Sequence, residues 1–91
     1  MIFITTYKTK PYMAPEETKE LMSRFAETGP GPGTTAHYMA ADGSHGVVVS
    51  ENDDLGAIYR NMVGYQQWIE FDSTAMLTVD EAVPHIMDAL A

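Results

Sequence analysis

Three histidines, His37, His45 and His85, are the side chains of this chain best suited to proton transfer or metal binding. A catalytic zinc ion needs about three protein ligands, and the chain has no cysteine to supplement its histidines. His37 and His45 are expected on opposite faces of one hairpin, and His85 has only Asp88 at helical spacing. The sequence therefore predicts no metal site.

His37 is the histidine for which a catalytic role is worth weighing. An imidazole has an unperturbed pKa near ~6.5, so it can act as a general base at neutral pH. Beside Tyr7, Ser50, Asp72 and Thr74, it would place a base and hydrogen-bond donors in one cavity. The competing interpretation, which we favour, is a histidine bonded to a neighbouring hydroxyl at a dimer seam.

Other patterns that carry chemistry are missing or misplaced. The run Gly29-Pro30-Gly31-Pro32-Gly33 resembles a phosphate loop, but it follows a predicted helix instead of preceding one, and its prolines lack N–H groups. Ser50 lacks the flanking glycines of a nucleophile elbow. No cofactor is expected.

Composition narrows the class of protein. The 91 residues are 45% hydrophobic, which predicts one globular domain over residues 1–91. Thirteen acidic against five basic residues give a net charge of −8, so nucleic acids and anionic membranes are not expected partners. An acidic protein that inhibits another protein stays open as an alternative. Neither a membrane span nor a signal peptide is predicted, and we expect a cytoplasmic location.

Periodicity predicts the elements in order. Expected are a strand over 2–8, a helix over 15–28, a hairpin over 35–50, an amphipathic helix with apolar residues from Leu55 to Ile69, a strand over 71–77 and a last helix opened by the capping box Thr78–Glu81. We expect Asn52 or Asp53 to cap the second helix, and Pro84 to kink or to start the last one. This is the ferredoxin-like βαββαβ plait, an α+β fold with a four-stranded antiparallel sheet and an extra C-terminal helix.

The central hairpin fixes which residues share a face. With Asp42-Gly43 as a two-residue loop, Ala40 pairs with His45, and His37 pairs with Val48. One face then carries Ala36, Tyr38, Ala40, His45, Val47 and Val49, and the other carries Thr35, His37, Met39, Gly46, Val48 and Ser50. The first face is the more apolar, so we expect it to pack on the helices, and the second to line a cavity or meet another subunit.

Two helices cover only one side of a sheet. Four apolar residues are expected on the uncovered side, namely Phe3, Met39, Val48 and Met76. Self-association through that side is the economical solution, so the sequence predicts a homodimer.

Between Gly33 and Met76 the chain carries several short motifs, namely Tyr38-Met39-Ala40, Gly43-Ser44-His45-Gly46-Val47, Glu51-Asn52-Asp53-Asp54, Tyr65 and the strand from Phe71 to Met76. This block resembles the DUF3303 family, which belongs to the dimeric α/β-barrel superfamily. Met39 stands where the family pattern has a histidine, and Ala75-Met76 stands where it has Pro-Val. The resemblance implies a dimer whose two sheets enclose a shared cavity. Related barrels include cofactor-independent monooxygenases, polyketide cyclases and ligand-binding proteins.

We therefore expect a homodimer that binds a hydrophobic small molecule, acyl-chain or polyketide-like, between the sheet and the dimer interface. The candidate ligand-binding residues are Phe3, Thr5, Tyr7, His37, Met39, Val48, Ser50, Asp72, Thr74 and Met76. Two alternatives remain: a cofactor-independent monooxygenase or cyclase with His37 as general base, and an acidic protein-interaction or inhibitor module.

Overall fold

The computed structural model describes all 91 residues, which form four strands and three helices. In chain order they are β1 (Ile2–Thr9), α1 (Pro15–Thr28), β2 (Thr34–Met39), β3 (Gly46–Glu51), α2 (Leu55–Val63), β4 (Ile69–Met76) and α3 (Val79–Leu90). The strands make one sheet in the order β2-β3-β1-β4, with every neighbouring pair antiparallel. The ferredoxin-like α+β fold with an added C-terminal helix is confirmed.

The first helix begins and ends where its sequence predicts. Pro15 opens α1, and the carboxylate of Glu17 accepts a hydrogen bond from the backbone N–H of Ala14 at 3.3 Å. Gly29 ends the helix with a φ of 67°, and its N–H donates to the carbonyl of Phe25.

The hairpin has the predicted register from Ala36 to Met39, but its turn differs, and an irregularity at Thr35 places Thr34 in its stead opposite Ser50. Ala36, His37, Tyr38 and Met39 pair with Val49, Val48, Val47 and Gly46, as expected. The Gly43 N–H donates to the Ala40 carbonyl, so the turn begins at Ala40 and the predicted two-residue loop is wrong. Only Gly43 has positive φ, whereas the predicted turn needs it at Asp42 as well. The Asp42 carboxylate instead accepts hydrogen bonds from the backbone N–H and the hydroxyl of Ser44.

The second helix is shorter than its apolar pattern predicts. Asp54 caps it, in place of Asn52 or Asp53, by accepting a hydrogen bond from the Ala57 N–H at 3.0 Å. The helix ends at Val63, and turns then carry the chain into β4. Gly64 disfavours a further helical turn, so Tyr65 belongs to the connection that follows and Ile69 to the strand.

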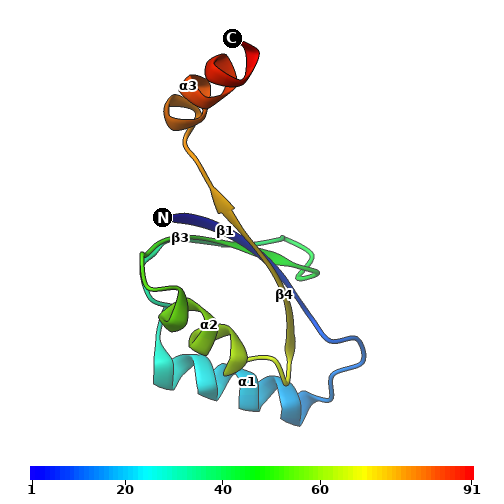
Figure 1. Ribbon diagram of the computed structural model, residues 1–91. Helices are drawn as coiled ribbons and strands as arrows, with labels where there is room; N and C mark the ends of the chain where they lie inside the picture. Colours follow the sequence, from blue (N-terminus) through cyan, green and yellow to red (C-terminus); the bar gives the residue numbers. More distant parts are fainter.

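The two helices α1 and α2 lie side by side on one face of the sheet (Figure 1). Side chains alternate along each strand, and the register therefore defines two faces. The covered face, toward α1 and α2, carries Phe3, Thr5, Tyr7, His37, Met39, Gly46, Val48, Ser50, Phe71 and Ser73. The open face carries Ile2, Ile4, Thr6, Ala36, Tyr38, Val47, Val49, Asp72, Thr74 and Met76.

This assignment reverses the predicted one. The more apolar hairpin face, with Tyr38 and Val47, is the open one, and the mixed face with His37 lies against the helices. The hairpin in isolation misleads because β1 and β4 add Phe3, Tyr7 and Phe71 to the mixed face. Four residues were expected on the uncovered side of the sheet. Three of them, Phe3, Met39 and Val48, lie on the covered face, and only Met76 lies on the open face.

The last helix stands apart from the rest of the chain. Figure 1 shows α3 beyond the far end of β4, with no other element beside it. Its predicted capping box is confirmed, because Thr78 and Glu81 exchange two hydrogen bonds of 3.1 Å. The helix runs without a break through Pro84, so it does not begin there. No helix of the chain is long and apolar enough to cross a membrane.

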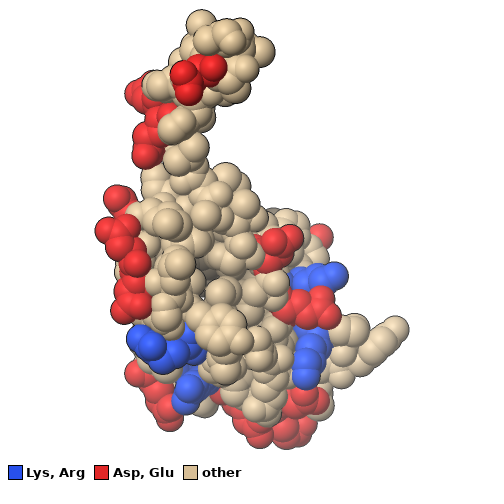
Figure 2. Space-filling view, viewed as in Figure 1, with Lys and Arg blue, Asp and Glu red and all other residues tan.

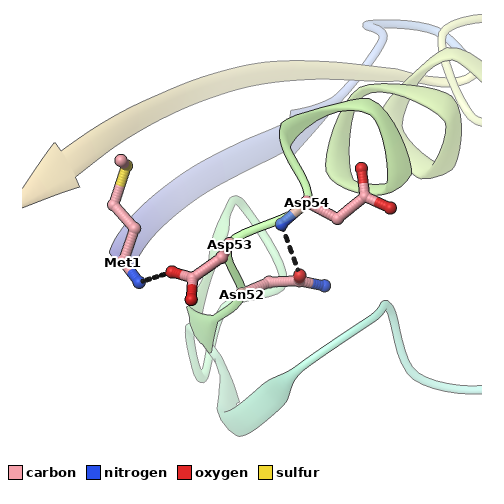
Figure 3. A network of polar contacts seen from close by, with 4 residues as sticks. All are labelled: Met1, Asn52, Asp53 and Asp54. Carbon is pink, nitrogen blue, oxygen red and sulfur yellow. Dashed lines mark hydrogen bonds and ion pairs between the residues drawn. The ribbon is translucent and has the colours of Figure 1, made fainter.

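A polar contact joins the start of β1 to the loop between β3 and α2 (Figure 3). The Met1 amino group lies 2.6 Å from the Asp53 carboxylate, and the Asn52 side chain accepts a hydrogen bond from the Asp54 N–H. The Asp53 pKa is lowered by its hydrogen bond to the amino group, whose own pKa is raised in return. The pair is exposed, so it holds this end of the sheet only weakly.

The capping box makes the stability of α3 depend on pH. Hydrogen bonds from Thr78 lower the pKa of Glu81 below its ordinary value of 4.5. The contribution of Glu81 is therefore complete above pH 4.5 and is lost as the pH falls through the lowered pKa. We expect amide exchange in α3 to speed up over that range. The change should largely vanish in Glu81→Gln, which keeps an uncharged acceptor, and persist in Asp80→Asn.

Candidate functional site

A groove lies between the covered face and α1. Its volume is about 190 Å³, and eight of its thirteen lining residues are hydrophobic. The strands contribute Tyr7, Thr9, His37, Met39, Ile69 and Phe71, and the helices and their connections contribute Leu21, Met22, Phe25, Gly29, Gly31, Asn61 and Tyr65. A second hollow of about 60 Å³ shares Gly31, Asn61 and Phe71 with the groove and extends toward α2.

A tyrosine–histidine pair is the main polar feature of the groove lining, and His37 itself is exposed. The hydroxyl of Tyr7 lies 2.5 Å from Nε2 of His37, and their rings meet edge to face at 5.5 Å between centroids. Burial raises the pKa of the Tyr7 phenol above 10.0, so it is protonated at neutral pH and can donate to a neutral imidazole. The ring of Phe25, from α1, lies 6.3 Å from that of His37 and closes the other side.

Gly46 sets the position of Tyr7. The two residues face each other across β1 and β3, and a Cβ at position 46 would overlap the Tyr7 ring. Phe71 is the partner of Tyr7 on β4, with ring centroids 6.3 Å apart. The phenol ring is thus held between a glycine and an aromatic ring, and its hydroxyl is aimed at His37.

The far end of the groove is fixed by a hydrogen bond between the two helical segments. The hydroxyl of Thr28, at the end of α1, lies 2.5 Å from that of Tyr65, which follows α2. Tyr65 is 7% exposed. This bond holds the end of α1 against the connection into β4 and keeps the groove at its present width.

No charged side chain lines the groove or the smaller hollow. In Figure 2 the acidic side chains lie along the margins of the molecule and on α3, and the basic ones lie in the half that holds α1 and α2. Within the groove the polar groups are the Tyr7–His37 pair, the Asn61 amide and the hydroxyls of Thr9 and Tyr65. The arrangement suits a largely apolar, uncharged group with one hydrogen-bonding end.

The structure brings together seven of the ten sequence-predicted site residues and separates the other three. Tyr7, His37 and Met39 line the groove, and Thr5, Val48 and Ser50 line the smaller hollow. Phe3 is buried on the same face. The three on the open face are Asp72, Thr74 and Met76, opposite Thr6, Ile4 and Ile2 of β1. Asp72 therefore cannot act together with His37.

Sequence reasoning missed the wall formed by the helices. The helix predicted over 15–28 presents Leu21, Met22 and Phe25 to the sheet, but a groove remains between them and the strands. Asn61 was not considered at all. A signal for it existed, because Asn61 is a polar residue in the apolar series Ile58, Met62 and Tyr65.

The other histidines lie elsewhere. His45 follows the hairpin turn, with Nδ1 2.8 Å from the Ser44 hydroxyl, and borders a shallow polar hollow near Asp72. His85 is exposed on α3. No group of three His, Asp or Glu side chains could hold a metal ion.

Comparison with known families agrees with the predicted resemblance. A family model described as Domain of unknown function (DUF3303) matches residues 1–90. The chain belongs to the DUF3303 family. The match extends well beyond residues 33–76, on which the resemblance rested, and so includes α1, the groove and α3 of this DUF3303 protein. No curated protein matched the chain.

The packing of Tyr7 on Gly46 predicts opposite effects for two glycine substitutions. Gly46→Ala forces the Tyr7 ring out of place and should destabilise the protein by about 1–3 kcal/mol. Gly56→Ala, in the first turn of α2, meets the flexible end of Arg60 at 3.2 Å and the capping Oδ1 of Asp54 at 3.3 Å, both of which can give, and should stabilise the protein by at most about 0.5–1 kcal/mol. Urea unfolding measures both. Equal effects of one sign would contradict the packing described.

Proposed function

We propose that this DUF3303 protein is a homodimer that binds a hydrophobic small molecule in the groove of each chain. The observation that supports binding is the uncharged apolar groove with the Tyr7–His37 pair at its centre. The predicted site between sheet and dimer interface thus moves to the helix side of the same sheet. A cytoplasmic location is part of the proposal, in keeping with a chain that contains no cysteine and so needs no disulfide.

The size of the groove limits the ligand. A dry apolar cavity of about 150 Å³ holds benzene. At about 190 Å³, with a further hollow of about 60 Å³ beside it, the groove has room for a single ring or a short acyl chain. A longer acyl or polyketide-like chain would extend past Met22 and Met39, which are 58% and 68% exposed at the groove. Their flexible side chains can adapt to different apolar shapes.

The ligand's polar end is expected at the Tyr7–His37 pair. A ligand hydroxyl there can donate to the phenol oxygen, and a ligand carbonyl can accept from the Asn61 amide on the adjoining wall. A carboxylate is less suitable, because the groove supplies no cation and the chain carries a net charge of −8. We infer that the ligand binds uncharged.

One observation keeps an enzyme in view. In the tautomer in which Nε2–H of His37 donates to the Tyr7 oxygen, Nδ1 is the basic nitrogen that a general base requires, and this tautomer supports a cofactor-independent monooxygenase or cyclase. However, no carboxylate lines the groove to stabilise a protonated imidazole. Binding without chemistry is therefore the function that we put first.

Binding is tested with octan-1-ol and octanoic acid as probes, followed by NMR chemical-shift titration. Octan-1-ol should bind more tightly than octanoate at neutral pH, with shifts at Tyr7, Phe25 and Asn61. Tyr7→Phe removes the hydroxyl but keeps the ring, so octan-1-ol should bind about 3–10-fold more weakly. Asp72→Asn, on the open face, is the matched control and should bind normally.

Two results together would oppose the proposal. They are the absence of saturable shifts with either probe, and native mass spectra of protein purified from cells that show only the bare chain or its dimer. Saturable binding that Asp72→Asn weakens and Tyr7→Phe leaves intact would move the site to the open face.

The enzyme alternative has its own test. Once a substrate is identified, His37→Ala should reduce turnover at least about 100-fold if His37 is the general base. Unchanged turnover in that variant, with the fold intact by circular dichroism, would eliminate this alternative and leave ligand binding untouched.

A further inference from the structure

The helix α3 exposes a complete apolar stripe. Its members are Val79, Val83, Ile86, Met87 and Leu90, which are between 45% and 78% exposed. They recur at helical spacing and so share one side of the helix, while Glu81 and Asp88 lie on the opposite side and Asp80 borders the stripe. Amphipathic helices of globular proteins bury such a stripe, and here nothing in the same chain covers it (Figure 1).

The open face of the sheet is a second apolar surface without a covering layer. Ile4 and Val49 are paired at its centre, with Val47 and Ala36 beside them on β3 and β2. Tyr38 is 65% exposed and Met76 is 41% exposed at the two edge strands. One chain thus leaves bare both an apolar helix stripe and an apolar sheet face, which are the two layers that pack in α+β folds.

The exposed area shows how much is left uncovered. A folded monomer of 10.0 kDa is expected to expose about 5,200 Å², whereas this chain exposes 6605 Å². Its radius of gyration is 15.9 Å, against about 12 Å for a compact chain of this length. Two chains that each lost the excess would bury roughly 2,800 Å² in total, the range of obligate homodimers.

We propose that α3 is an exchanged arm: α3 of each copy packs its apolar stripe on the open face of a second copy. The idea rests on the proposed homodimer and adds which surfaces form it. One two-fold axis relates both contacts, so the surfaces are satisfied reciprocally and the assembly closes at two chains.

The connection between β4 and α3 favours a second copy over the chain's own sheet. Only Leu77 and Thr78 separate the strand from the helix. Thr78 is extended, with φ −64° and ψ 160°, and the capping box fixes it there. The helix therefore leaves in the direction of β4, beyond the end of the sheet, and with the cap intact it folds back only through a sharp bend at Leu77 (Figure 1).

Charge agrees with this orientation. Glu81 and Asp88 lie opposite the stripe, and Asp80 lies at its edge, so these carboxylates stay in water when the stripe is covered. Two chains of charge −8 repel each other, and salt screens that repulsion without weakening apolar contacts. The dimer is therefore expected to hold or tighten as salt rises.

The first test compares two variants, each of which adds one negative charge to α3, one within the stripe and the other on the opposite side of the helix. Ile86→Glu lies in the stripe and His85→Glu lies away from it, and both are exposed, so neither should disturb the fold of a single chain. Because each substitution acts twice in a symmetric dimer, Ile86→Glu should raise the dimer dissociation constant roughly 100-fold or more. His85→Glu should leave it within about threefold. Sedimentation equilibrium measures both.

The second test locates the arm, using a chain without native cysteine. Copies with Ile86→Cys are mixed with tagged copies that carry Thr6→Cys, an exposed position on the open face, and treated with a flexible bis-maleimide. Cross-links should join the two kinds of chain. A mixture of Ile86→Cys with Ser23→Cys, exposed on α1, should give none.

The outcomes separate this proposal from the homodimer and from ligand binding. A dimer that persists in Ile86→Glu and yields no cross-link to Thr6→Cys overturns the exchanged arm but keeps the homodimer. A further variant carries both Thr6→Cys and Ile86→Cys in one chain. A cross-link between these two cysteines of the same chain also overturns the exchanged arm, in favour of an arm folded on its own sheet. A monomeric wild-type protein overturns both. Octan-1-ol titration of the same samples reports separately on the groove.

Discussion

The alternation of side chains across four strands in one fixed register is the constraint on which the site depends. Tyr7, His37 and Phe71 come from three strands and meet in the groove only because β1 pairs Tyr7 with Gly46 and with Phe71. A slip of one residue in any strand would turn its contribution to the other face. Gly46 resists such a slip, because only glycine leaves room for the Tyr7 ring, and the Thr5–Ser73 hydrogen bond of 2.8 Å holds β1 on β4.

Local sequence signals were sufficient for most of the fold. Pro15 and Gly29 bound α1, the Thr78–Glu81 box opens α3, and the hairpin pairs in the predicted register. These features depend on neighbours in sequence or on strict alternation. Two predictions were wrong, the type of turn at Asp42 and the end of α2. At the turn, the Asp42 carboxylate bonds to Ser44 and so favours a different backbone conformation. In α2, Gly64 ends at Val63 a helix that the apolar pattern would continue.

The choice of face could not be made from the hairpin, because both of its faces carry apolar residues. Which face the helices cover depends on β1 and β4, whose aromatic residues Phe3, Tyr7 and Phe71 outweigh the valines of β3. The site was predicted in part for the same reason. Tyr7, His37 and Ser50 follow from strand parity, whereas Phe25 and Asn61 reach it through helix packing that no spacing in the sequence specifies.

The inversion of the two faces has a physical explanation if a second chain is present. Only four hydrophobic residues are buried within one chain, and none is fully enclosed, so the monomer holds little core of its own. The helices cover the face that contains Thr5, His37 and Ser50, and polar atoms of these residues line the groove or the smaller hollow beside it. The open face has Ile4, Val47 and Val49 at its centre, and in a lone chain these residues are left to water, which costs free energy that the proposed second copy would recover. The proposal thus assigns the covered face, with its polar groups, to a ligand, and the apolar centre of the open face to association.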